Sequence, residues 1–413
     1  MGRYYCYQSL VYFMELGGII IVASAAFTLA MMNHTNELTA MLAAGVSLHR
    51  VSLPIVICSM VMGGLVMLDQ ELLIPRVAPQ LVMSRDERLD TLEFEVKLIS
   101  DSQGSIFYAR QYNTGEERMW PAVVMTRDRD LGMTALLAGA DATASEYGGQ
   151  GGWLLSQASL AGTARLGTTW QQTQDYERIY SSVGPLGMLE ACRDAAGGQV
   201  TLDEIGQADD LRMHDAEYGM TIHAERFVPV SKLVEDSQQW GGVIHKPQFT
   251  FQAADGKQVG SFLADEATWE QAEQGQGCWR LVGGRYFYPS DLTPDELVLR
   301  ESSNWMDYMS TTDLTKLMKT QAISDRQGAE MIKHSRFTAP LNNLLMLLLG
   351  LPFILSRERN IKASVTLCLL TVAGFFALIF ICRYMGLSAI LAAWLPIFLF
   401  GPVAIIMFDS VKT

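Results

Sequence analysis

The sequence predicts an α-helical membrane protein with five transmembrane helices and a large, inserted, jelly-roll-like β-rich domain. Two observations carry this prediction. Long apolar runs lie at both ends of the 413 residues, and the stretch between them is charged and rich in turn residues. The expected domains are N-terminal membrane helices at 1–75, a β-rich region at 76–336 and C-terminal membrane helices at 337–413.

Each apolar run is close to the length of about 20 residues that crosses about 30 Å of hydrocarbon. Four of them carry no charge, and the first contains only Glu15. Glu15 lies near the start of its run, so we expect it at the membrane interface. The first run is too long for a cleaved signal peptide and lacks a cleavage site. The five runs are Leu10–Met32, Val51–Leu68, Phe337–Ser356, Ala363–Cys382 and Leu387–Phe408.

The region between the runs carries almost the whole net charge of the chain. Only six of the 44 acidic residues and seven of the 31 basic residues lie outside residues 76–336. The region is therefore acidic and solvated, which argues against nucleic-acid binding.

Short aromatic or branched runs in this region predict β-strands, and their spacing favours a sandwich or jelly roll over a parallel α/β domain. Helical patterning is expected at 312–334, and capping boxes are expected at 201–204 and 324–327. The strand order cannot be read from the sequence. The predicted strands are Ser105–Arg110, Ala122–Met125, Trp153–Leu155, Gly260–Leu263 and Trp279–Val282.

A short helix is predicted at 36–45, between the first two apolar runs. Thr35 or Asn36 can cap its start, and Gly45 supplies a stop at its end. Its apolar stripe is Leu38, Met41 and Leu42, and the flanking residues are small alanines. Such a helix is suited to docking another protein; an ordinary interfacial turn is the alternative.

Each predicted span takes the chain across the membrane once. Counting the spans therefore places the loops at 33–50 and 357–362 on one side of the membrane and the β-rich region on the other. Counting Lys and Arg near the membrane ends does not decide which side is cytoplasmic.

Several motifs resemble the lipopolysaccharide-export permease family of LptF/LptG type, in order and in spacing. The first is Glu37-Leu-Thr-Ala-Met-Leu-Ala-Ala-Gly-Val-Ser47, and Leu73-Ile-Pro-Arg76 closes the following span. The C-terminal motifs and the start of the β-region agree too: Pro340-Leu-Asn-Asn-Leu-Leu-Met-Leu-Leu-Leu-Gly-Leu-Pro352, Ser356-Arg-Glu-Arg359, Ala392-Ala-Trp-Leu-Pro396 and Ser105-Ile-Phe-Tyr-Ala-Arg110.

The resemblance implies a permease subunit of an ABC-type exporter in the bacterial inner membrane, with its β-domain in the periplasm. Such a subunit extracts lipopolysaccharide or a similar glycolipid and passes it to a periplasmic bridge protein. Its partners would be an ABC ATPase dimer and a second, related permease. The chain has no Gly-x-x-x-x-Gly-Lys-[Ser/Thr] loop, so ATP would be hydrolysed by the partner. No enzymatic activity and no cofactor are expected.

Two departures from the family stand out. The family has six membrane helices, and this chain starts at what resembles the second, either because its start is truncated or because it works without the first. Residues from about 185 to 300 also exceed the family's usual β-domain.

The resemblance gives two groups of candidate residues. An ATPase-coupling group lies on the short helix: Glu37, Leu38, Met41, Ala44 and Gly45. A lipid-binding group lies at the outer ends of spans, where guanidinium groups can pair with phosphate: Arg76, Arg336 and Arg383. Ordinary snorkelling of these arginines to the interface is the alternative.

No catalytic constellation and no trustworthy metal-ligand spacing stand out, and Cys192 and Cys278 are a possible disulfide pair. A membrane-anchored periplasmic binding or scaffold protein without ATP coupling is the alternative function, and a membrane-bound hydrolase ranks below it.

Overall fold

The computed structural model describes residues 2–82, 92–127, 132–162, 173–195, 207–234, 237–252, 258–271, 277–319, 323, 325–355 and 361–409. The chain forms two compact units. One comprises Met1–Arg85 and Ser302–Thr413, and the other is Asp86–Glu301.

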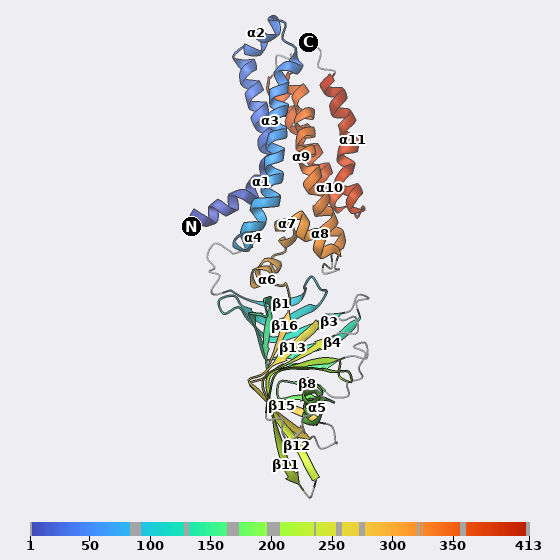
Figure 1. Ribbon diagram of the computed structural model, residues 1–413. Coiled ribbons are helices and arrows are strands. Elements are labelled where there is room, and N and C mark those ends of the chain that lie inside the picture. The colour runs from blue at the N-terminus through green and yellow to red at the C-terminus, as the bar shows by residue number, and fades with distance from the viewer. Residues whose placement is uncertain are drawn as a thin grey trace. The chain divides into compact units, whose positions relative to one another are not determined.

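The first unit is a bundle of long helices that run beside one another (Figure 1). Among the described residues, four stretches are long and apolar enough to cross a membrane: Tyr5–His34, Leu48–Val82, Thr366–Tyr384 and Ala389–Asp409. These confirm four of the five predicted spans. The fifth, at 337–356, lies in the helix α9 and runs past the described residues, so it stays a prediction. The helices are α1 (Gly2–His34), α2 (Glu37–Ala43), α3 (Leu48–Leu68), α4 (Ile74–Val82), α7 (Trp305–Tyr308), α8 (Thr311–Lys319), α9 (Arg326–Leu355), α10 (Ile361–Tyr384) and α11 (Ala389–Asp409).

Helix α9 lies at the centre of the bundle and packs against α1, α3, α10 and α11. Glycines permit three of these approaches, as expected where membrane helices meet closely. A Cβ on Gly18 of α1 would collide with the Asn343 side chain, and one on Gly63 of α3 would meet Pro340 at 3.1 Å. A Cβ on Gly350 would meet the sulfur of Cys368 in α10 at 2.9 Å.

A π-helical segment, η1 (Asp69–Leu73), joins α3 to α4 without a break. The Ile74 N–H bonds to the Asp69 carbonyl, five residues back, where an α-helix would reach back four. The helix that contains the second candidate span therefore continues past Arg76 to Val82.

Several helices from the predicted β-rich region belong to the helical unit. Leu314 and Leu317 of α8 pack against Ile323 and Ala329, and Ile74 and Leu81 of α4 pack with Val11. The boundaries between the two units fall at 85/86 and 301/302, inside the β-rich region that was predicted at 76–336.

The second unit is one antiparallel sheet built from the 16 described strands. All five predicted strands are present, and the pattern of short strands at close intervals is confirmed. The strands are β1 (Glu93–Ser100), β2 (Ile106–Asn113), β3 (Arg118–Arg127), β4 (Met133–Gly139), β5 (Asp141–Tyr147), β6 (Gln150–Ser156), β7 (Ser159–Gly162), β8 (Gln174–Asp175), β9 (Arg178–Tyr180), β10 (Ala208–Asp215), β11 (Met220–Val234), β12 (Ser237–Gln252), β13 (Gln258–Leu263), β14 (Glu266–Gln271), β15 (Gly277–Val282) and β16 (Arg285–Pro289).

The sheet is nearly closed because its path begins at β8 and ends at β9, which are neighbours in the chain. The fully buried Gln174 joins them: its amide donates to the Tyr180 carbonyl at 3.2 Å and accepts from the Tyr180 N–H at 2.6 Å. Large buried aromatic residues, among them Trp153, Tyr112 and Phe107, fill the core.

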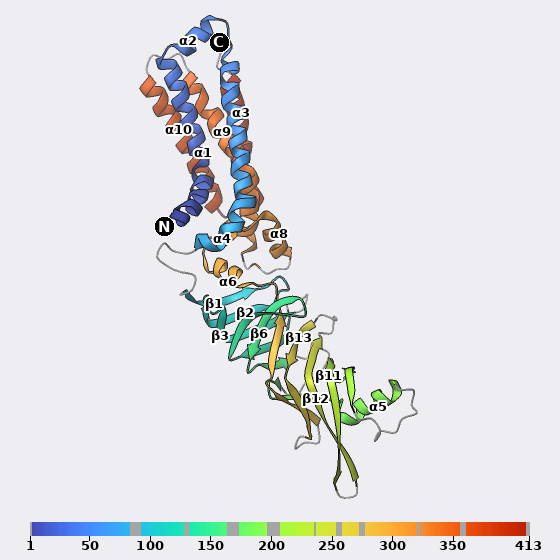
Figure 2. The same ribbon diagram turned by 60° about the vertical axis from the view of Figure 1, so that its left-hand side comes forward.

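Two features branch from this path. Strand β1 pairs with β2 alone among the described strands. Strands β11 and β12 form a long hairpin that extends beyond the rest of the sheet (Figure 2), and in its outer part they pair only with each other. Two more helices belong to this unit, α5 (Pro185–Ala195) and α6 (Pro294–Glu301).

Only one of the two predicted capping boxes can be compared with the structure. Residues 201–204 lie outside the described part of the chain. At 324–327, Asp325 supplies the cap by accepting from the Gly328 N–H at 2.8 Å. Cys192 and Cys278 are free cysteines, so the possible disulfide is not formed.

Candidate functional site

The short helix α2 forms where it was predicted, but it starts differently from the expectation. Asn36 occupies the N-cap position in the left-handed conformation (φ 59°) and makes no capping bond with its side chain. The Thr35 hydroxyl instead donates back to the Met31 carbonyl at 3.0 Å, so neither residue caps in the predicted way. Gly45 ends the helix as expected, with φ 83°, which costs an L side chain about 1–2 kcal/mol.

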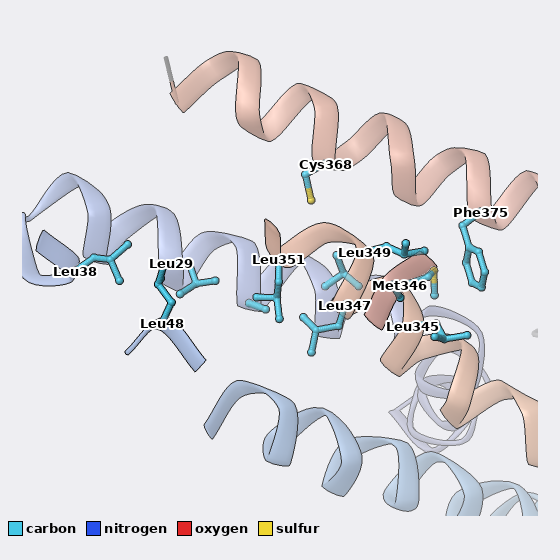
Figure 3. Close-up of a cluster of buried hydrophobic side chains, with 13 residues drawn as sticks. Leu29, Leu38, Leu48, Leu345, Met346, Leu347, Leu349, Leu351, Cys368 and Phe375 are labelled. Atoms are coloured by element: carbon cyan, nitrogen blue, oxygen red, sulfur yellow. The ribbon is translucent and has the colours of Figure 1, made fainter. Parts of the chain in front are cut away.

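One face of α2 is anchored to the bundle. Leu38 is 5% exposed and belongs to a buried cluster with Leu29, Leu48 and Leu351 (Figure 3). Met41 is half-buried, while Glu37, Ala44 and Gly45 are exposed. Of the five predicted coupling residues, three are therefore available to a partner, and Leu38 holds the helix in place.

The buried cluster continues along α9 towards α10 and α11. It contains Leu345–Leu347, Leu349, Leu351, Cys368, Phe375 and Ala404, and Figure 3 shows several of these side chains directed toward one another. The start of α3 is tied to the end of α11 by the rings of His49 and Phe408, whose centroids lie 5.0 Å apart. Helix α2 contacts α1, and the cluster that contains Leu38 links these two helices to α3 and α9.

At its other end, α9 presents Arg336, the most enclosed of the predicted lipid-binding residues. Its side chain is 3% exposed and forms an ion pair of 3.2 Å with Glu71 of η1. The same guanidinium donates to the carbonyls of Met306 and Asp307, each at 3.2 Å, and to that of Met309. Glu71 also accepts from the Thr311 N–H at 3.0 Å and from the Thr311 hydroxyl. The Arg336 guanidinium is thus already matched by protein groups.

The helical unit contains a cavity of about 300 Å³. Polar residues from several helices line it, including Glu15, Gln70, Asp307, Arg336, Asn342 and Arg383, together with apolar residues such as Met14, Ile19, Phe376 and Phe380. The structure thus brings Arg336 and Arg383 to one cavity. Arg76 does not line it and is exposed on α4.

Asp307 is a second carboxyl group near these arginines. Burial raises the pKa of Asp307 above its ordinary value of 3.8, and the charges of Arg383 and Arg336 offset only part of that rise. Burial therefore disfavours the ionised form of Asp307 in spite of the two nearby guanidinium groups.

Glu15 is exposed on α1 and lines the cavity. Its expected place at the membrane interface stays a prediction.

Several residues of this site were not singled out from the sequence: Glu71, Asp307, Gln70 and Asn342. The sequence could have indicated a partner for Glu71. It lies close to an apolar run, and a carboxylate in a membrane is costly unless it is paired. Among the described residues, no group of three His, Cys, Asp or Glu side chains is arranged to hold a metal ion.

The sequence matches the model of a known protein family. Residues 1–178 and 219–410 match the family described as lipopolysaccharide export system permease LptF/LptG. The chain belongs to this family. No individually curated protein gives a sequence match.

The LptF/LptG match leaves out residues 179–218. Residues from about 185 to 300 were expected to exceed the family's usual β-domain. The stretch outside the match is shorter than that, because the match resumes at residue 219. The excluded stretch holds α5 and β10. Its two ends are tied together by the fully buried Asp215, which accepts from the hydroxyls of Ser181 at 2.7 Å and Ser182 at 2.6 Å.

Membership makes this chain a multi-pass membrane protein of lipopolysaccharide export and a permease, which is a transporter component. Its apolar helices and its inserted β-rich unit agree with that assignment.

Proposed function

We propose that this protein is the permease subunit of an ABC-type exporter in the inner membrane, with α2 as the docking element for a partner ATPase. The observation that carries the proposal is the two-faced environment of α2. Leu38 fixes one face in the bundle, and the small residues Ala40, Ala43 and Ala44 lie exposed on the other. A partner can therefore approach the helix backbone closely, and its movement would reach α9 through the buried cluster that contains Leu38.

Helix α9 is a single continuous helix that could transmit a movement of α2 along the bundle. Its buried leucines belong to the same cluster as Leu38, and some 15 residues earlier in α9 Arg336 is bonded to α7, α8 and η1. ATP is held and hydrolysed by the partner dimer, and this chain needs no cofactor of its own. A second, related permease completes the transport path.

Arg76 and Arg383 are the proposed contacts to phosphate groups of lipopolysaccharide or a similar glycolipid. Both are exposed, and no ion pair involving them is found in the described part of the chain. Arg336 is assigned a structural role at the same end of the bundle, because its guanidinium is already bonded to Glu71 and three carbonyls.

The lipid would pass to a periplasmic bridge protein through the β-rich unit. Strand β1 supports this step, because it pairs only with β2 among the described strands, and strand addition needs an edge without a partner strand. The charged residues Glu93, Glu95 and Lys97 on this strand would limit pairing with unsuited partners.

The second candidate is a membrane-anchored periplasmic binding or scaffold protein without ATP coupling. The large β-rich unit would suit a binding or scaffold protein. That function does not explain why α2 exposes small residues while it is fixed to the bundle.

The exposed face of α2 separates the two candidates. Glu37→Lys reverses an exposed charge at the helix start, and Ala44→Trp places a bulky ring at the exposed end. We expect both variants to insert normally and to lose ATPase copurification and lipid export. The matched control is Asp409→Asn, an exposed charge at the end of α11. Normal copurification and export in both variants would leave α2 as a connector and favour the scaffold.

A further inference from the structure

The cavity of the helical unit contains hydrogen-bonding groups that the proposed function does not use. Asn342 of α9 is 8% exposed, and its Oδ1 is buried without a hydrogen-bond partner among the described residues. The Oε1 atom of Gln70 in η1 is likewise buried and without a partner in the described part of the chain. Both residues line the cavity.

Unpaired buried amides are costly, at roughly 1–3 kcal/mol each, so their retention points to something that satisfies them. Either amide can present its oxygen to the cavity, because a half-turn of its terminal torsion exchanges oxygen and nitrogen. The volume of about 300 Å³ is far more than one water molecule needs and lies at the lower end of ligand pockets.

Two acidic residues, Glu15 and Asp307, and two basic residues, Arg336 and Arg383, line the cavity. Because Glu71 already pairs with Arg336, the cavity has one more carboxyl group than unpaired guanidinium groups. Glu15 also lines the cavity, and no ion pair involving it is found among the residues that the structure describes. A carboxylate within a membrane span ordinarily has a partner or a functional role.

The remaining walls are suited to an amphiphilic cation. Phe376 and Phe380 of α10 line the cavity, and the faces of aromatic rings attract ammonium groups within about 6 Å. Met14, Ile19 and Met346 add apolar surface for a hydrocarbon chain.

We propose that this cavity binds the primary ammonium head group of an amphiphile, with Glu15 as its counter-charge and Gln70 and Asn342 as hydrogen-bond acceptors. An ammonium group donates three hydrogen bonds and accepts none, which matches one carboxylate and two amide oxygens. This site goes beyond the proposed export function and does not depend on it, since a membrane lipid can occupy it whether or not the permease drives export.

The test uses the full chain in a neutral detergent and native mass spectrometry. Short-chain phosphatidylethanolamine is titrated against phosphatidylglycerol with the same acyl chains, and ammonium chloride is added in a separate arm. The variants are Glu15→Gln, which is nearly isosteric, and Asn342→Leu. Asp409→Asn is the control, because it removes a charge from the same unit at an exposed position that does not line the cavity.

We expect phosphatidylethanolamine to bind at least tenfold tighter than phosphatidylglycerol. Glu15→Gln and Asn342→Leu should each remove that preference, and the control should keep it. Competition by ammonium chloride would show that the ammonium group alone occupies the site, and its failure would show that the acyl chains are needed as well; either supports the site. Equal binding of the two lipids, or an unchanged preference in Glu15→Gln, would overturn the proposal.

Discussion

The Arg336 guanidinium lies 3.2 Å from the Glu71 carboxylate, which joins α9 to the π-helical segment η1 across 265 positions of sequence. Both groups also bond to the segment at 306–311, which contains α7 and the start of α8. This pair fixes one end of the central helix, while the cluster around Leu38 occupies the other.

Breaking this ion pair should destabilise the helical unit. Arg336→Gln leaves the Glu71 carboxylate without its partner, and loss of one member of a buried pair costs about 3–5 kcal/mol. The measurement is the unfolding temperature and folded yield in detergent. Arg383→Gln is the control, because that side chain is exposed. If Arg336→Gln were as stable as the wild type but bound less lipid, its role would be ligand binding and the structural assignment would be wrong.

Shortening Leu38 should loosen α2 without removing its docking surface. Leu38→Ala deletes a buried side chain, at about 2–5 kcal/mol, and the exposed alanines stay in place. We expect lower coupling of ATPase activity to lipid release in proteoliposomes, with normal membrane insertion. Thr39→Ala, on the exposed side of the same helix, should behave as the wild type. Equal coupling in the two variants would show that the anchor at Leu38 is not needed.

Asp215 should be essential to the part of the β-rich unit that lies outside the family match. Its carboxylate is fully buried and accepts from Ser181, Ser182 and the N–H groups of Glu217 and Tyr218. Asp215→Ala should lower the free energy of unfolding by about 3 kcal/mol or more, since each bond to a charged group contributes roughly 1.5–3 kcal/mol. Hydrogen exchange at 181–183 reports the loss. Asp209→Ala, which removes an exposed ion pair with Arg226, should cost under about 1 kcal/mol.

The raised pKa of Asp307 predicts how the stability of the protein changes with pH. Its pKa is raised in the folded state, so the folded protein holds a proton that the unfolded chain releases, and stability falls as pH rises from about 3.8. Asp307→Asn, which stays neutral, should therefore have a higher unfolding temperature than the wild type at pH 7. The difference should shrink toward pH 4. A difference that grows as pH falls would mean that attraction to Arg383 and Arg336 outweighs burial.

Much of the architecture follows from local pattern. The apolar runs predicted four confirmed spans, and short aromatic runs predicted five confirmed strands, because both signals depend on neighbouring residues. Gly45 was predicted to end α2 for the same reason, since its positive φ is a local requirement. The start of α2 was missed because Asn36 takes a left-handed conformation in which its side chain does not cap.

The candidate site was predicted only in part, because long-range contacts decide it. Nothing near Arg336 in the sequence reveals that Glu71 neutralises it, and nothing near Gln174 reveals that its amide closes the sheet. The cavity is lined by residues of α1, α3, η1, α7, α9, α10 and α11, so it has no local sequence signature.

The central claim is that the exposed face of α2 docks a cytoplasmic ABC ATPase while the β-rich unit lies in the periplasm. The most direct measurement is cysteine crosslinking in intact cells with Ala44→Cys and Gln150→Cys, both at exposed positions. The account predicts that Ala44→Cys crosslinks to an ABC ATPase that copurifies with the protein. It also predicts that Gln150→Cys gives no such product and reacts with a membrane-impermeant reagent before lysis, above the background of the native cysteines. Labelling of Gln150→Cys only after lysis, or an Ala44→Cys protein that captures no ATPase, would contradict it.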